Sequence, residues 1–273
     1  MIVYPNAKIN IGLKVLEKRK DGYHNLESNF VPLPWYDALE IIENKKSVKK
    51  KVQFTTTGLP IAGDPSTNLC LKAYRLLDLD FDLPSIKMHL HKEIPMGAGL
   101  GGGSSDGAFA LKLLNDFFEL SLNTATLKKY AAQLGSDCPF FIQNKNSFVT
   151  GRGEKITNSL LDVSGLHIVV IYPSLHISTG EAYQNIQRTP IRHELKSLPS
   201  WTKKTWSKRI ENDFEGYAFE RYPLLSSIKE SLYQKGAIYA GMSGSGSAMF
   251  GLFESAPKLL LSWKKHIVFQ AIL

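Results

Sequence analysis

The residue types best suited to chemistry lie in one glycine-rich segment, residues 95–108, which reads PMGAGLGGGSSDGA. A backbone so rich in glycine can turn several N–H groups toward one concavity, where they bind anions. Ser104 and Ser105 are predicted to open a helix, whose N-terminus carries roughly half a positive charge. Amides, hydroxyls and helix dipole then converge where a polyphosphate could lie. We therefore interpret this segment as a phosphate-binding loop.

Other glycine-rich motifs and a purely structural role are the alternatives for this segment. No Gly-Lys-Ser/Thr closes it, so it is not a Walker A loop, and the acidic residue of a Rossmann fingerprint is missing. The catalytic-loop and Asp-Phe-Gly signatures of protein kinases are also absent from the sequence. A flexible linker or a tight turn is the structural alternative, but a linker would not normally run from an apolar strand straight into a strong helix.

Two charged side chains elsewhere have both a functional and a structural interpretation. Asp137 is the only carboxylate in the apolar segment 135–141 and precedes Pro139, so the residues alone favour a helix N-cap. Lys8 and Asn10 share one face of a predicted strand whose other face is apolar. On this pattern alone, Lys8 would be an exposed lysine on a half-buried strand.

Three further segments could contribute to a site. Residues 21–24, Asp-Gly-Tyr-His, form either a turn with two rings that bind a ligand or a hairpin turn with incidental aromatics. The small residues 241–247 form either a tight turn or a place where another loop or a substrate approaches the backbone. His89 and His91 share a strand face, but no third ligand follows, so metal binding is not expected there.

The elements that must position these residues follow from hydrophobic periodicity and turn signals. Strands are predicted at 6–13, 28–34, 38–43, 51–57, 86–91, 167–172, 237–241 and 248–253. Helices are predicted after Asn68, as its N-terminal cap, and at 105–118, 124–134, 180–187, 213–220 and 223–235. This mixture predicts an α+β fold in two lobes, residues 1–158 and 159–273.

Composition is that of an ordinary globular protein of 273 residues, with 43% hydrophobic and 21% charged residues. No apolar run approaches the ~20 residues of a membrane span, and no secretory signal is expected at the N-terminus. Cys70 and Cys138 have no metal-ligand spacing, so we expect no disulfide framework and a reducing, cytoplasmic location.

The formal charge of +8 indicates anionic partners, which could be nucleic acid, acidic lipid or phosphorylated metabolites. The lysines within 45–51 are interpreted as a solvated hairpin tip. The basic stretch 188–209 is interpreted as a long irregular segment that could form a lip over a site. Neither carries a nucleic-acid-recognition signature.

Taken together, these segments resemble the GHMP small-molecule kinase superfamily. Its three landmarks occur in order, at residues 5–10, 95–108 and 242–247. Within it, the segments 7–10, 21–24, 101–105 and 135–141 resemble the family of kinases that phosphorylate the 2-hydroxyl of 4-diphosphocytidyl-2-C-methyl-D-erythritol, in non-mevalonate isoprenoid biosynthesis. The resemblance covers nearly the whole chain.

The resemblance implies a two-lobed GHMP kinase fold, with a ribosomal-protein-S5-like N-terminal lobe and a ferredoxin-like C-terminal lobe. It implies Asp137 as catalytic base, which replaces the capping interpretation although one carboxylate could serve both roles, and Lys8 as its electrostatic partner. Either Tyr23 or Tyr183 would stack on the cytosine and His24 would hydrogen-bond its edge. Asn10 and Thr179, with Asp137, would hold the methylerythritol end.

The resemblance also implies ATP as phosphoryl donor, Mg²⁺ with Ser105 as a candidate ligand, and a small-molecule substrate. No nucleic-acid or membrane partner is expected, and the chain is expected to be a monomer or a homodimer. The residues expected to bind ATP are Asn68, Lys92, Pro95, Met96, Gly97, Ala98, Gly99, Leu100, Gly101, Gly102, Gly103, Ser104 and Ser105.

Two departures and two rival functions accompany the resemblance. Gly107 replaces the usual alanine, which should loosen the first helical turn by at most ~1 kcal/mol, and Tyr183 stands where phenylalanine is expected. A mevalonate or homoserine kinase would leave Tyr23 and His24 without a role. A catalytically silent, ligand-sensing relative that contacts nucleic acid or protein would not need an intact Lys8 and Asp137.

Overall fold

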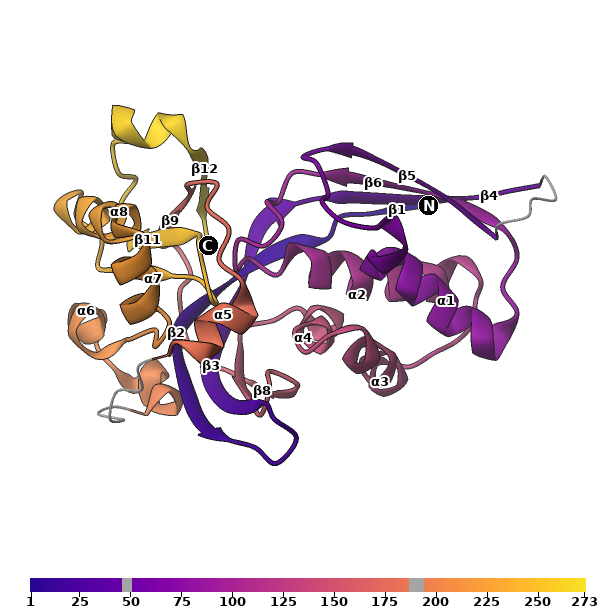
Figure 1. Cartoon of the computed structure of the whole chain (residues 1–273), viewed down its shortest axis with the longest axis horizontal. Coiled ribbons are helices and arrows are strands. Elements are labelled where there is room, and N and C mark those ends of the chain that lie inside the picture. The colour runs from indigo at the N-terminus through magenta and orange to yellow at the C-terminus, as the bar shows by residue number, and fades with distance from the viewer. Residues whose placement is uncertain (46–50, 187–193) are drawn as a thin grey trace. The chain divides into compact units, whose positions relative to one another are not determined.

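The computed structural model describes residues 1–45, 51–186 and 194–273, and they form two compact units, each of mixed α and β structure (Figure 1). Unit 1 comprises residues 1–7, 35–96 and 101–145, and unit 2 comprises residues 8–34, 97–100 and 146–273. The two units are described separately. The predicted boundary between residues 158 and 159 stays a prediction.

Unit 1 is a four-stranded sheet with helices packed against one face (Figure 1). Its strand order is β1 (Ile2–Val3), β4 (Ala38–Glu43), β6 (Ile86–Lys92) and β5 (Val52–Gly58), with only the β5–β6 pair parallel. Its helices are α1 (Leu69–Phe81), α2 (Gly102–Phe117), α3 (Thr124–Leu134) and α4 (Cys138–Gln143). Leu39, Met88 and Leu90 alternate with exposed or half-buried residues, so one sheet face forms the core.

Local capping signals explain where two of these helices begin. The Asn68 side chain accepts a hydrogen bond from the Cys70 amide at 2.9 Å, which confirms it as the N-cap of α1. Asn123 caps α3 in the same way, and α3 has the predicted bounds. Helix α2 begins at Gly102, three residues earlier than predicted, so Gly102 and Gly103 belong to its first turn.

Gly107 is needed for packing between α1 and α2, which the sequence did not reveal. A Cβ placed on Gly107 would lie 2.8 Å from Leu69 Cβ, a contact that no side-chain rotation can relieve. We expect Gly107→Ala to destabilise the protein by ~1–2 kcal/mol, because overpacking at this contact outweighs the better helix propensity of alanine. Urea unfolding at constant pH measures the change. A more stable variant would show that α1 can shift without cost.

Unit 2 contains two antiparallel four-stranded sheets. The first has the order β2 (Asn6–Lys18), β3 (His24–Tyr36), β7 (Ser147–Thr150) and β8 (Lys155–Asn158), although the ends of β2 and β3 extend into unit 1. The second has the order β10 (Tyr239–Met242), β11 (Met249–Phe253), β9 (His167–Tyr172) and β12 (Ile267–Ile272). Strands β1, β7, β8 and β12 were not predicted.

Helices α5 (Thr179–Gln184), α7 (Glu215–Arg221) and α8 (Pro223–Gln234) complete unit 2, close to their predicted bounds. Leu225, Ile228 and Leu232 of α8 are buried in one hydrophobic cluster with Val169 and Ile171 of β9. This cluster forms the core beneath the second sheet.

The prediction of an irregular segment at 188–209 is wrong for its described part. From Leu195 the chain forms short helical turns, Leu195–Ser200 and Lys203–Thr205, followed by α6 (Trp206–Arg209). The side chains of Leu195, Leu198 and Trp206 are buried, so hydrophobic anchoring fixes this stretch. Residues 187–193, and 46–50 of the lysine-rich stretch, lie outside the described residues.

Candidate functional site

The first half of the glycine-rich loop, residues 97–100, belongs to unit 2, where backbone hydrogen bonds hold it in place. Lys8 N–H donates to the Leu100 carbonyl at 2.9 Å, and Ala248 N–H donates to the Ala98 carbonyl at 3.0 Å. Gly99 has φ +79°, and a Cβ there would lie 2.0 Å from the Ser243 carbonyl oxygen. Only glycine fits this left-handed and crowded position.

The small-residue loop 241–247 is what approaches Gly99, as one of its two interpretations predicted. Ser243 is buried, and its hydroxyl donates to the Gly99 carbonyl at 2.8 Å and accepts from Asn10 N–H at 3.3 Å. Asn212 holds this loop by donating to the carbonyls of Met242 and Gly244 at 2.8 and 2.9 Å. Ser243 and Asn212 are positioning residues that the sequence did not identify individually, because Asn212 has no motif around it.

Lys8 and Asn10 point the same way from β2, as their two-residue spacing predicted. Lys8 Nζ donates to Asn10 Oδ1 at 2.5 Å and lies 3.3 Å from the Gly99 carbonyl oxygen. The side chain is only 3% exposed, so its interpretation as an ordinary exposed lysine is wrong. A buried cation beside the glycine-rich loop favours developing negative charge there.

Unit 1 carries the second half of the loop at the start of α2. Ser105 is buried, and its hydroxyl has no hydrogen-bond partner within the described chain. Ser104 instead makes a hydrogen bond with Cys138, whose pKa is raised to about 12 chiefly by burial. This bond ties the first turn of α2 to the first residue of α4, directly after Asp137.

Asp137 occupies the N-cap position of α4, with Pro139 in the first turn. Among the described residues, however, the amides of α4 donate no capping hydrogen bond to its side chain. The capping interpretation is therefore correct for the position and wrong for the interaction.

A buried ionic cluster lies beside the start of α2. Lys92 Nζ, at the end of β6, pairs with Asp37 and with Asp106 Oδ2, the latter at 2.7 Å. Asp37 also accepts hydrogen bonds from the amides of Glu93 and Ile94 at 2.7 and 2.9 Å. The cluster thus joins the end of β6, the residue before β4 and the N-terminal part of α2. The Lys92 side chain is fully buried by these partners.

Asp37 and Asp106 were not predicted as members of this site. Asp106 lies inside the glycine-rich segment, directly after Ser104 and Ser105, and this position could have indicated that it belongs to the site. Asp37 is a single carboxylate between two strands, and only the antiparallel pairing of β4 with β6 brings it to Lys92.

Burial raises the pKa of Asp106 to about 7, against the lowering effect of Lys92, while the neighbouring Asp37 raises it further. Below the ordinary aspartate value of 3.8 the proton is bound in both the folded and unfolded states. As the pH rises toward 7 the unfolded state loses the proton first, so this group's stabilising contribution is lost. We therefore expect the free energy of unfolding of Asp106→Asn, relative to that of the parent protein, to be higher at pH 8 than at pH 5. Urea unfolding at both pH values measures the difference, and an unchanged difference would contradict it.

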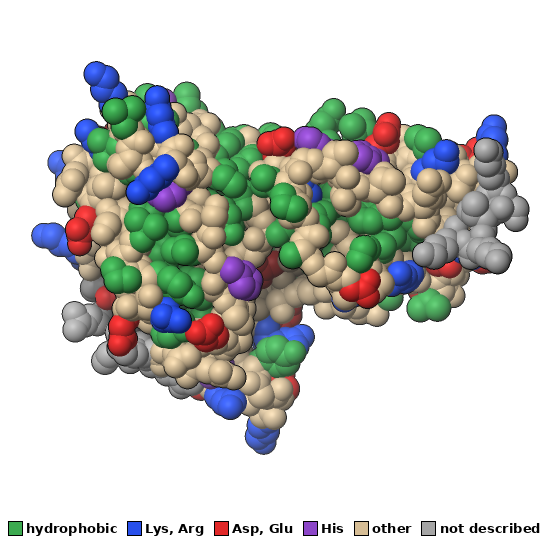
Figure 2. All heavy atoms as spheres, turned by 45° about the horizontal axis from the view of Figure 1, so that its top comes forward, with side chains coloured by type: hydrophobic (Ala, Val, Ile, Leu, Met, Phe, Trp, Pro, Cys, Tyr) green, Lys and Arg blue, Asp and Glu red, His purple; other side chains and the backbone are tan. Residues whose placement is uncertain are grey.

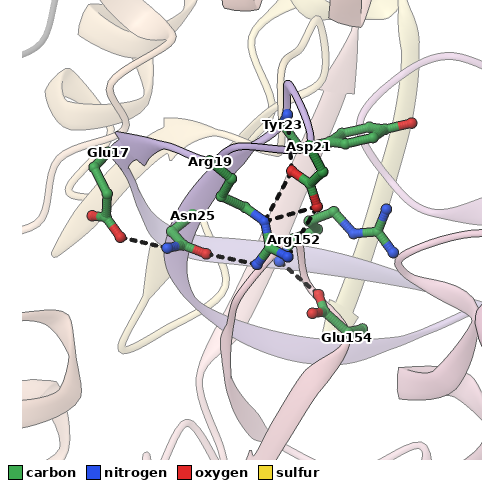
Figure 3. Close-up of polar contacts among 7 residues, drawn as sticks. All are labelled: Glu17, Arg19, Asp21, Tyr23, Asn25, Arg152 and Glu154. Atoms are coloured by element: carbon green, nitrogen blue, oxygen red, sulfur yellow. Dashed lines mark hydrogen bonds and ion pairs between the residues drawn. The ribbon is translucent and has the colours of Figure 1, made fainter.

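The aromatic residues of the predicted substrate site form two groups in unit 2. His24 and Tyr183 stack with ring centroids 5.4 Å apart and planes 8° apart, and Phe214 packs edge-on against Tyr183. Tyr23 is 57% exposed at the β2–β3 hairpin tip, with the Arg152 guanidinium over its ring (Figure 3). Thr179 begins α5, and its hydroxyl lies 3.1 Å from that of Ser245.

Histidine, cysteine, aspartate and glutamate side chains are common ligands of metal ions in proteins. Within the described ranges, no three His, Cys, Asp or Glu side chains come together as a metal site. The same residues contain no helix that is long and apolar enough to cross a membrane.

Comparison with known proteins gives matches along most of the chain. The family model for the GHMP kinases N terminal domain matches residues 68–145, and that for GHMP kinases C terminal matches residues 200–268. A 4-diphosphocytidyl-2-C-methyl-D-erythritol kinase of Bacteroides fragilis (strain YCH46) is 49% identical over 95% of this chain and 94% of its own. The corresponding kinase of Cytophaga hutchinsonii is 46% identical over 94% of each chain.

Solved structures agree with these matches. A crystal structure of 4-(cytidine 5'-diphospho)-2C-methyl-D-erythritol kinase has a TM-score of 0.75 and 30% identity, over 92% of this chain and 90% of that one. Streptococcus pneumoniae phosphomevalonate kinase has a TM-score of 0.68 at 14% identity, over 100% of this chain and 99% of its own, which shows a shared fold alone.

Proposed function

Because this chain belongs to the GHMP kinases, in the family of 4-diphosphocytidyl-2-C-methyl-D-erythritol kinases, we propose that it phosphorylates the 2-hydroxyl of that compound with ATP. The similarity of nearly the whole chain to kinases with this one name carries the proposal. The buried Lys8–Asn10 pair beside a glycine-rich loop is the local feature that such a reaction needs.

The reaction is an in-line displacement at phosphorus. The substrate oxygen forms a bond to the γ-phosphorus of ATP, the bond from that phosphorus to the β,γ-bridging oxygen breaks, and ADP leaves with the electron pair. Asp137 accepts the hydroxyl proton, and Lys8 is its electrostatic partner and stabilises charge on the transferred group. Such a reaction demands mainly positioning and charge stabilisation from the protein.

The glycine-rich loop is proposed to bind the phosphates of ATP. Residues 95–105 would supply backbone amides, and α2 would supply its N-terminal dipole. The buried hydroxyl of Ser105 has no hydrogen-bond partner among the described residues. It fits a ligand of the Mg²⁺ that accompanies ATP, because oxygen donors suit this ion. When bound, Mg²⁺ supplies charge neutralisation on the phosphates. Asn68 and Lys92 stay predictions as neighbours of the adenine.

The substrate's two ends are assigned to unit 2 side chains and to Asp137. Tyr23 or Tyr183 would stack on the cytosine and His24 would hydrogen-bond its edge. The parallel stack of His24 on Tyr183 supports a common aromatic surface for these two. Asn10 and Thr179, with Asp137, would hold the methylerythritol end.

Incubation with ATP, Mg²⁺ and 4-diphosphocytidyl-2-C-methyl-D-erythritol, with ADP release as the readout, tests the proposal. Mevalonate and homoserine serve as parallel substrates. Release with the cytidyl substrate alone is the expected result. Release with a control alone would keep the phosphate loop and discard the cytidine site, and no release at all would favour a silent, ligand-sensing protein.

We further propose a cytoplasmic enzyme, monomeric or homodimeric, that binds no nucleic acid. Cys70 and Cys138 are free and buried, which suits a reducing compartment. On the face drawn in Figure 2, the described lysines and arginines stand mostly apart, among acidic and uncharged groups, rather than in one basic stripe. Salt-sensitive binding to DNA or RNA at physiological ionic strength would contradict this proposal.

A further inference from the structure

The tip of the β2–β3 hairpin and the β7–β8 turn bring two arginines to the same place (Figure 3). The first, Arg19, is neutralised locally. It forms an ion pair with Asp21 at 3.0 Å and donates to Asn25 Oδ1 at 3.0 Å. The hydrogen bond from Arg19 is also the main cause of the lowered pKa of Asp21. Arg19 therefore belongs to the framework of the hairpin.

The second arginine, Arg152, has a different environment. Its backbone N–H donates to Glu154 Oε2 at 2.6 Å. The Glu154 carboxylate therefore accepts from the backbone of the turn rather than from the Arg152 guanidinium. Within the described part of the chain, no carboxylate lies within ion-pair distance of the Arg152 side chain, and its buried Nε–H has no hydrogen-bond partner. Arg152 also contributes to the lowered pKa of Asp21 through its charge, but this leaves the Nε–H without an acceptor among the described residues. A buried N–H group without an acceptor is costly in the absence of a ligand.

The position of the Arg152 guanidinium indicates what could supply the missing acceptor. Its central carbon lies 4.9 Å from the centroid of the Tyr23 ring. Figure 3 shows the tyrosine ring and the guanidinium projecting toward the same side of the hairpin, away from Glu17 and Asn25. The half-exposed Tyr23 ring can contact a flat base, and the Arg152 guanidinium beside it can bind an anion.

We propose that Arg152 is a substrate-binding residue that pairs with the diphosphate of the cytidine-diphosphate moiety while Tyr23 contacts the cytosine. This inference rests on the proposed function, since it assumes a cytidine-diphosphate substrate. The forked donors of arginine match phosphate oxygens bidentately, and the ligand would satisfy the Nε–H that the protein leaves unpaired.

Calorimetric titration with CDP and with cytidine tests the proposal independently of turnover. In Arg152→Gln, CDP affinity should fall on the order of tenfold to a hundredfold, as expected for loss of a charge-assisted contact, while cytidine affinity stays within about twofold. The CDP affinity of Arg152→Lys should lie between those of the parent protein and Arg152→Gln, because lysine keeps the charge but lacks the forked donors of arginine. Lys20→Gln is the matched control, since it removes the same charge from an exposed position on the β2–β3 hairpin tip that carries Tyr23. It should leave both affinities unchanged.

The alternatives give different patterns. Equal losses for cytidine and CDP would show that Arg152 only positions Tyr23, and would overturn the diphosphate contact. Unchanged CDP affinity in Arg152→Gln, or an equal loss in Lys20→Gln, would also overturn it. If the parent protein binds CDP and cytidine but does not turn over the cytidyl substrate, the proposed function fails and the comparison of the two ligands still decides the role of Arg152.

Discussion

Asp137→Asn is expected to lower kcat by ~10²–10⁴ while the Kd of ATP stays within about twofold. Removal of the carboxylate removes the proposed acceptor for the hydroxyl proton, whereas the glycine-rich loop is untouched. The local fold should persist, because asparagine is an equally good N-cap and the α4 amides make no capping bond to Asp137 within the described chain. Single-turnover kinetics with saturating ATP, combined with nucleotide titration, separates the two quantities.

Asp64→Asn is the matched control for this substitution. Asp64 also precedes a short helix, and its carboxylate accepts from the Ser66 amide at 2.8 Å, far in sequence from any proposed catalytic residue. This variant should keep its kcat. If Asp137→Asn turned over normally, Asp137 would not be the base, and the structural interpretation of this carboxylate would return.

The parts of the site that the sequence predicted are those that depend on neighbours along the chain. The spacing of Lys8 and Asn10 placed them on one strand face, and Asn68 marked the start of α1. The glycines of residues 95–108 predicted a tight, anion-binding backbone, and Gly99 has the positive φ that this requires. Such signals are visible because φ and ψ preferences and side-chain periodicity act over a few residues.

The parts that the sequence did not predict depend on contacts between distant segments. Arg152 meets Tyr23 only because β3 pairs with β7, and Asn212 reaches loop 241–247 across 30 residues of sequence. Burial also changed one interpretation. The pattern around Lys8 indicated a half-exposed strand, but both faces of most of β2 are covered. No local pattern reports which face a second layer will cover.

Lys92→Met is expected to have the largest effect on stability, a loss of ~3–5 kcal/mol. Burial alone would lower the pKa of Lys92, but Asp106 and Asp37 together raise it, so its charge is firmly held. Methionine fills much of the same volume but leaves two buried carboxylates without a cation. The loss should be smaller at pH 5 than at pH 8, because protonation then relieves the unpaired carboxylates. Urea unfolding at both pH values measures it.

Lys51→Met is a closely matched control, because Lys51 also pairs with two aspartates, Asp78 at 2.8 Å and Asp82 at 2.6 Å. That side chain is 45% exposed, so water screens the pairs, and its loss should cost much less stability than the loss of Lys92. Equal losses in Lys92→Met and Lys51→Met would mean that burial does not decide the strength of these pairs.

The triple variant Lys92→Met, Asp37→Asn, Asp106→Asn should recover much of the stability that Lys92→Met loses, since no buried charge remains in the cluster. The amide oxygen that Asp37→Asn introduces can still accept from the backbone N–H groups of Glu93 and Ile94, so these two donors stay satisfied. If the triple variant were as unstable as Lys92→Met, the unpaired carboxylates would not be the cause of the loss. The cost would then come from the packing around the lysine stem, where β6 meets the first turn of α2.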